Sequence, residues 1–144
     1  MNQLYQATLL AHAKKPYGAG SVPRGTEDAE ALNPGCGDDI RIRMTWTPDG
    51  ALERLTHEVH GCAVSVAGAS LAAQRLEGRT RKEIAAMTAA FESRLGKGGF
   101  EGDWGDFQVF NGIEKFPARL HCARLIWQAV EQALARAPGD REVS

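Results

Sequence analysis

Residues 40–60 read IRIRMTWTPDGALERLTHEVH, and this stretch decides the fold. Apolar side chains recur at every second position of its first part, at Ile40, Ile42, Met44 and Trp46. This period-two pattern is typical of a strand with one face on a core and the other in water. Residues 47–50 have proline in the second and glycine in the fourth position, as a type I turn prefers. Leu55 and His57 share one face of the return segment 52–60, so the stretch predicts an antiparallel hairpin.

Helical patterns flank this hairpin. Apolar spacing predicts helices over 2–14 and over 63–77, the second rich in small residues that allow close packing. Thr80 and Glu83 match a capping box that opens a third helix, and Pro117 suits the first position of a fourth. The aromatic segment from Phe100 to Lys115 is expected to pack against the body. The polar connection from Tyr17 to Pro34 is long for a compact domain unless it packs or serves a site. We expect one domain over residues 1–136 and a flexible tail over 137–144.

Composition and charge exclude several classes of protein. The chain has 144 residues, 17 basic and 18 acidic side chains, and a formal net charge of −1. This balance gives no overall field for nucleic acid or an anionic membrane, and no apolar run is long enough to cross a bilayer. The first residues lack the basic and apolar regions of a secretory signal, which favours a cytoplasmic protein. Three cysteines in a reducing compartment do not form a disulfide framework, so they serve the core or chemistry.

Each cysteine has its own setting. Cys122 continues the apolar stripe of the last helix, where core packing explains it. Cys62 follows Gly61 at the expected start of a helix, where the helix dipole favours a thiolate. Cys36 lies between two glycines in the turn before the first strand of the hairpin. An inert buried thiol rarely needs such a turning context, so a functional role is the better interpretation of Cys36.

Other candidate ligands lie beside these cysteines. Asp38 is two residues beyond Cys36, so both side chains can converge on one ion, although an aspartate that caps the turn is an equally ordinary interpretation. His121 precedes Cys122, and neighbours on a helix point about 100° apart, so the two are alternatives unless the helix begins there. His60 is interpreted as an ordinary strand residue, although it is close enough to Cys62 to reach a nearby site. If these segments gather, three thiolates and a carboxylate or imidazole suit tetrahedral zinc or an iron–sulfur cluster.

Four stretches resemble the iron–sulfur cluster assembly scaffold family, which includes IscU, SufU and the NifU N-terminal domain. They are residues 33–38 (NPGCGD), 61–65 (GCAVS), 115–119 (KFPAR) and 120–127 (LHCARLIW). The long separation between Cys62 and Cys122 and the segment before Cys122 resemble the SufU branch. His121 departs from that branch, which usually has lysine there, and is similar to the IscU type.

This resemblance implies a fold, a site and a set of partners. The fold is α+β, a small and mainly antiparallel sheet packed against several helices. The implied ligands are Cys36, Cys62 and Cys122 with Asp38 as the fourth, and His121 as an alternative. The resemblance also places Arg119 near the site, where it can pair with Asp38 or a thiolate.

Two functions follow from the resemblance. The first is a scaffold that accepts sulfur from a SufS-like cysteine desulfurase, with Cys122 as the persulfide acceptor, and passes a transient cluster to apo iron–sulfur proteins. The second is a zinc-dependent sulfur acceptor that stimulates the desulfurase without holding a cluster. The first is a non-enzymatic role and the second is that of a sulfurtransferase, in a monomer or weak dimer. A purely structural zinc, whose removal would unfold the chain, is a third interpretation that the exposed loop settings disfavour.

Overall fold

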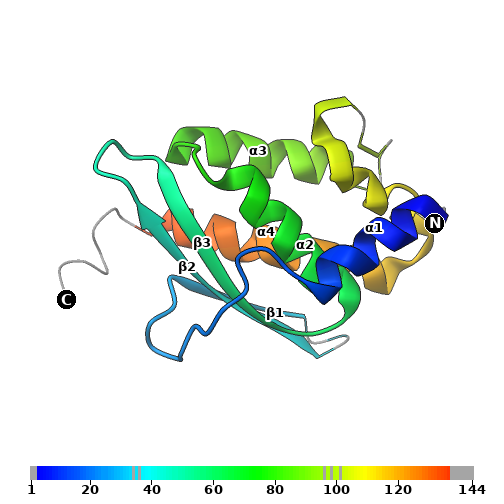
Figure 1. The fold of residues 1–144 in the computed structure, drawn as a ribbon, viewed down its shortest axis with the longest axis horizontal. Helices are drawn as coiled ribbons and strands as arrows, with labels where there is room; N and C mark the ends of the chain where they lie inside the picture. Colours follow the sequence, from blue (N-terminus) through cyan, green and yellow to red (C-terminus); the bar gives the residue numbers. More distant parts are fainter. Residues whose placement is uncertain are drawn as a thin grey trace.

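The computed structural model describes residues 3–33, 35, 37–95, 97, 99–100 and 102–136. The strands β1 (Ala29–Asn33), β2 (Asp38–Trp46) and β3 (Leu52–His60) form an antiparallel sheet in the order β1-β2-β3 (Figure 1). The α-helices are α1 (Gln3–Lys14), α2 (Ala63–Leu76), α3 (Arg81–Arg94) and α4 (Pro117–Ala135), and two short helical segments, η1 (Gly102–Phe110) and η2 (Ile113–Lys115), precede α4. The expected tail over 137–144 lies outside the described residues.

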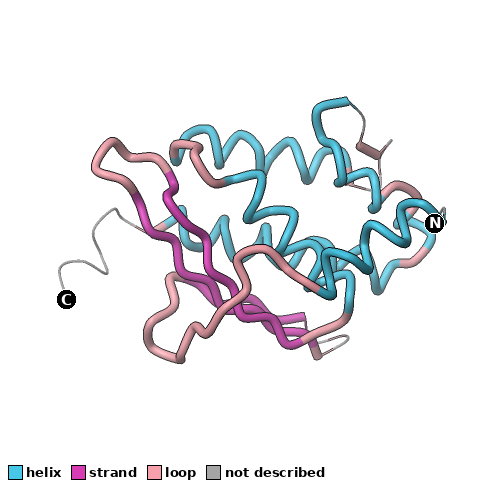
Figure 2. Tube along the Cα trace, in the orientation of Figure 1, coloured by secondary structure: helices cyan, strands magenta, loops and turns pink. Residues whose placement is uncertain are grey.

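The helices gather on one side of the sheet, as Figure 2 shows. Helix α4 packs against β1 and β2, and helix α2 packs against β3 and against α4. Helix α3 contacts α4, and α1 contacts α2 and η1. This arrangement confirms the predicted α+β class with a small antiparallel sheet against several helices. In the described ranges, no helix combines the length and apolarity needed to cross a bilayer.

The predicted hairpin is confirmed. Ile40 pairs with Val59 and Met44 with Leu55 across the two strands, and the turn closes through a 2.9 Å hydrogen bond from Gly50 N–H to the Thr47 carbonyl. The inward side chains Ile40, Ile42, Met44 and Leu55 are buried in the core. Strong alternation of apolar and polar side chains was therefore a reliable indicator here.

The connection before the hairpin contains a strand that was not predicted. This strand is β1, whose buried side chains are Ala29 and Ala31, 7% and 4% exposed. Alanine is depleted in strands and gives a weak alternation signal, which explains why this strand was not predicted. Earlier in the same connection, the Gly20 N–H donates to the His57 carbonyl at 3.0 Å, so the chain also pairs with the outer edge of β3.

Two charged side chains attach this connection to the sheet. Arg41 Nε donates to the Val22 carbonyl at 2.8 Å, and Glu58 Oε1 accepts from the Val22 N–H at 2.8 Å. Arg41 and Glu58 form an ion pair with each other at 3.2 Å. Both backbone groups of the fully buried Val22 are thereby satisfied by neighbouring strands, and burial of the connection leaves no polar group of this residue unpaired.

The aromatic segment packs against the body, as predicted. Phe100 and Phe107 contact Phe91 of α3, with ring centroids 5.3 and 6.0 Å apart. Phe91 also stacks on Trp127 of α4, with centroids 4.6 Å apart. The segment between α3 and α4 therefore completes the core at the end of α4 that follows Cys122.

The buried side chain of His57 makes the stability of the fold depend on pH. It is 1% exposed, and its Nε2 lies 2.7 Å from the Tyr17 carbonyl oxygen, which places the proton of the neutral ring on Nε2. Burial lowers the pKa of His57 below its ordinary value, although the hydrogen bond to Tyr17 opposes this shift. The unfolded chain therefore takes up this proton at a higher pH than the folded chain does.

We expect His57→Gln to reduce the loss of stability in mild acid. In the wild type, the free energy of unfolding falls as the pH drops below about 6.5, because the unfolded state binds the proton first. Urea denaturation at a series of pH values measures this slope, and His60→Gln on the same strand controls for the substitution itself. An unchanged slope in His57→Gln would contradict the assignment.

Candidate metal centre

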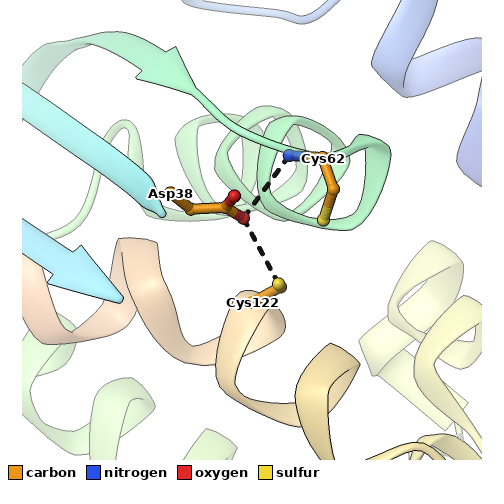
Figure 3. Close-up of side chains that lie close together, drawn as sticks. All are labelled: Asp38, Cys62 and Cys122. Atoms are coloured by element: carbon orange, nitrogen blue, oxygen red, sulfur yellow. Dashed lines mark hydrogen bonds between the residues drawn. The ribbon is translucent and has the colours of Figure 1, made fainter. Parts of the chain in front are cut away.

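Asp38, Cys62 and Cys122 meet at one end of the sheet (Figure 3). Asp38 is the first residue of β2, and the next residue, Asp39, pairs with His60 at the end of β3. Cys62 follows β3 by two residues and is the N-cap of α2. Cys122 lies in the second turn of α4, which crosses the same region. The hairpin register and the packing of α4 on the sheet thus bring three distant segments together.

The carboxylate of Asp38 is the centre of this group. Its Oδ2 accepts from the Ser65 hydroxyl at 2.5 Å, the Cys122 thiol at 3.3 Å and the Cys62 backbone N–H at 3.4 Å. Cys62 supplies no side-chain cap to its own helix. Asp38 therefore acts as an external cap of α2, in the position that an acidic N3 side chain takes in a capping box, at the positive end of the helix dipole.

Burial and hydrogen bonding act against each other at Asp38. The residue is 5% exposed, and burial by itself raises the pKa of its carboxyl. The hydrogen bonds from Ser65, Cys122 and Cys62 outweigh burial and hold the pKa below its usual value. Asp38 is consequently a carboxylate near neutral pH, the form that ligates a metal.

The backbone is built closely around this carboxylate. A Cβ on Gly61 would lie 2.6 Å from Asp38 Cγ and 2.8 Å from Oδ2. Real Cβ atoms do not approach other atoms so closely, so glycine is the residue that lets the chain pass the carboxylate. The motif of Gly61 followed by Cys62 thus has a steric origin in this fold.

The donor set fits a thiophilic divalent metal. Within the described residues, Asp38, Cys62 and Cys122 offer ligand atoms that all lie within 4.8 Å of one another. Tetrahedral zinc with Zn–S distances of about 2.3 Å holds its sulfur ligands about 3.8 Å apart, so small side-chain rotations suffice. Cys122 is 3% exposed and Cys62 is half-buried, so Cys62 is the more accessible of these two thiols.

The other predicted site residues have different positions. Cys36 lies outside the described residues, and its role as a ligand stays a prediction. His121 is exposed and lines a neighbouring groove with Leu32 and Asn33, so its role as an alternative ligand also stays a prediction. Arg119 is exposed and lines a pocket with Phe116, and its pairing with Asp38 or a thiolate stays a prediction.

One more histidine and one serine, His60 and Ser65, lie in the segments that form the centre. His60 turns to Asp39 and Glu58, 3.3 Å from each, as an ordinary strand residue would. Ser65 was not singled out from the sequence, although it touches Asp38 and lies 3.8 Å from Cys62 Sγ. Its position three residues after the N-cap cysteine, in a helix of small residues, is the signal that could have found it.

Comparison with known proteins gives consistent matches along the whole length. The family of the NifU-like N terminal domain matches residues 4–142. The zinc-dependent sulfurtransferase SufU of Bacillus subtilis (strain 168) is 33% identical over 142 residues, covering 96% of this chain and 95% of that protein. The iron–sulfur cluster assembly scaffold protein IscU of Streptococcus pyogenes serotype M1 is 28% identical over 146 residues, covering 100% and 91%.

A solved structure shows the same fold. It is a protein of thermophilic Fervidobacterium islandicum AW-1 that is assigned as an iron–sulfur cluster assembly scaffold for the SUF system. The two chains superpose with a TM-score of 0.72 at 25% sequence identity, over 88% of this chain and 93% of that one.

We expect Gly61→Ala to damage the centre and Gly68→Ala to leave it intact. The methyl group at position 61 displaces the Asp38 carboxylate, which lowers the free energy of unfolding by about 1–3 kcal/mol and weakens metal binding. At Gly68, inside α2, the nearest atom to an added Cβ is 3.7 Å away, an ordinary contact. Urea denaturation of the metal-free protein and zinc competition with a chromophoric chelator measure the two effects. Equal zinc affinities for the two variants would refute the steric role of Gly61.

Proposed function

Because this chain belongs to the family of the NifU-like N terminal domain, we propose that it is an iron–sulfur cluster assembly protein. In this proposal the centre of Asp38, Cys62 and Cys122, completed by Cys36, accepts sulfur from a cysteine desulfurase and serves as the scaffold for a cluster. The observation that carries the proposal is the convergence of one carboxylate and two thiols from β2, α2 and α4. Soft sulfur ligands of this kind suit iron–sulfur clusters.

Sulfur acceptance needs a nucleophilic thiolate, and we assign it to Cys122. Its Sγ attacks the terminal sulfur of the persulfide on the desulfurase, and a new S–S bond forms on Cys122. The S–S bond of the donor breaks, and its electron pair stays on the donor cysteine as a thiolate. The thiol must lose its proton before the attack, and the carboxylate of Asp38, 3.3 Å from Cys122 Sγ, orients the thiol by accepting its hydrogen bond.

The mixed donor set also bears on release of the cluster. A shell of thiolates alone would hold iron firmly, whereas a carboxylate is a harder and weaker partner for cluster iron. Asp38 therefore supports a cluster that can leave for an apo iron–sulfur protein. The desulfurase and the apo proteins are the partners that this function requires, and we propose that the chain acts as a monomer or weak dimer.

A second candidate function is a zinc-dependent sulfur acceptor that stimulates the desulfurase and holds no cluster. The similarity to the sulfurtransferase SufU, the higher of the two identities given above, favours it. The same residues would hold the metal, namely Asp38, Cys62 and Cys122 with Cys36. Zinc, when bound, supplies a positive charge that keeps the thiols deprotonated and protected until one of them is exchanged. Asp38 and the α2 N-terminus would orient the ligands around it.

Metal analysis and a desulfurase assay on one freshly isolated sample test both candidates. We expect one metal site per chain and transfer of sulfur from the desulfurase to the wild type. We expect Cys122→Ser to abolish this transfer, because serine is a far weaker nucleophile at neutral pH. Anaerobic reconstitution then separates the two functions. A cluster that transfers to an apo protein supports the scaffold, and tight zinc with desulfurase stimulation and no cluster supports the sulfur acceptor.

We also expect Asp38→Ala to prolong the life of a reconstituted cluster. Loss of the harder ligand removes the weak position through which iron leaves, so the visible absorption of the cluster should decay more slowly in the presence of an apo acceptor. Asp39→Ala is the matched control, because Asp39 is the neighbouring carboxylate on β2 and pairs with His60. A cluster in Asp38→Ala that decays as fast as in the wild type counts against the role of Asp38 in release.

A further inference from the structure

Ser65 is buried beside the candidate metal centre and contacts two of its ligands, Asp38 and Cys62. It is 2% exposed, its hydroxyl donates to Asp38 Oδ2 at 2.5 Å, and its Oγ lies 3.8 Å from Cys62 Sγ. A serine hydroxyl has a single proton. Because that proton goes to the carboxylate, the lone pairs of the Ser65 oxygen are available to accept a hydrogen bond from the Cys62 thiol. Ser65 therefore connects Cys62 to Asp38 in one short chain of hydrogen bonds.

The three contacts at Asp38 Oδ2 differ in what a metal would do to them. The Cys122 thiol loses its proton when it becomes a ligand, so its hydrogen bond to Asp38 is lost at that moment. The contacts from Ser65 and from the Cys62 N–H need no ligand proton and can persist. Of these two, the Ser65 contact is much the shorter, and it comes from a side chain that the core holds in place.

We propose that Ser65 is a positioning residue that holds the Asp38 carboxylate in its ligating orientation when metal enters the centre. This proposal rests on the proposed function, since it assumes that the centre binds a metal. Residues that hydrogen-bond to ligating carboxylates reduce the reorganisation needed on binding, and their loss weakens metal affinity. Without Ser65, the longer contact with the Cys62 N–H is what remains of the two contacts that need no ligand proton.

Helix α2 contains a second buried serine that provides a matched control. Ser70 is fully buried, and its Oγ accepts from the Tyr17 N–H at 2.9 Å and lies 2.8 Å from His12 Nδ1. Replacement of Ser70 by alanine removes buried hydrogen bonds from the same helix, as replacement of Ser65 does. Ser70 contacts α1 and the following connection, whereas Ser65 contacts the ligands, so only Ser65 should affect the metal.

The test is a double-mutant cycle on metal affinity. Zinc affinity is measured by competition with a chromophoric chelator, and cobalt(II) binding is followed through its ligand-field absorption, for Ser65→Ala, Ser70→Ala, Asp38→Asn and the double variant of Asp38→Asn with Ser65→Ala. We expect Ser65→Ala to lower zinc affinity about tenfold and to alter the cobalt spectrum. We expect Ser70→Ala to retain the wild-type affinity and spectrum. In the Asp38→Asn background, Ser65→Ala should have no further effect, because Ser65 acts through the carboxylate.

Several outcomes would overturn the proposal. Equal losses of affinity in Ser65→Ala and Ser70→Ala would assign Ser65 a general role in folding, and independent effects of Asp38→Asn and Ser65→Ala would exclude action through the carboxylate. Wild-type affinity in Ser65→Ala would also refute it. Thermal melting of each metal-free variant shows whether the chain is folded, and Ser65→Thr, which keeps a hydroxyl at this position, should retain the wild-type affinity. A wild type that binds neither zinc nor cobalt would instead refute the proposed metal centre itself.

Discussion

The structure depends on one buried carboxylate oxygen that accepts hydrogen bonds from two helices. Oδ2 of Asp38 takes the N–H that begins α2, the hydroxyl of Ser65 and the thiol of Cys122 on α4. A buried carboxylate without such partners would be costly, and buried helix ends also need partners. Donors from helices α2 and α4 and the acceptor on strand β2 therefore satisfy one another's hydrogen-bonding needs at this atom. The interaction that closes the fold at this end is therefore the same one that assembles the candidate ligands.

Local patterns predicted most of the secondary structure, because each such element has a signal within a few residues. The alternation at Ile40 to Trp46 gave the hairpin, and the pair Thr80 and Glu83 gave the start of α3, where both reciprocal hydrogen bonds of the capping box are present. Strand β1 was missed because its inward side chains are alanines. Its position is decided by pairing with β2, which the strand's own sequence does not reveal.

The candidate site, too, was predicted from the sequence only in part. Local context singled out Cys36, Asp38 and Cys62, but the spacing of the cysteines matches no compact metal-binding motif. A shared site with Cys122 was one possibility from the residue types, and the resemblance to the scaffold family named these residues as ligands. For Ser65 and Gly61 the local spacing gives at most a hint, because their roles are contacts with the side chain of Asp38 on β2, more than 20 residues away in the chain. Such tertiary contacts become visible when the register between β2 and β3 is known.

The aromatic packing around Trp127, in the part of α4 that follows Cys122, affects which side chain faces the site. Trp127 is stacked on Phe91 and also contacts Phe107, which fixes the rotation of α4 about its own axis. His121 and Cys122 are adjacent on this helix, about 100° apart around the axis. A rotation of α4 by one residue position would turn an imidazole, in place of a sulfur, toward Asp38. The packing of these rings, away from the candidate metal centre, thus helps to determine that a sulfur and not an imidazole faces Asp38.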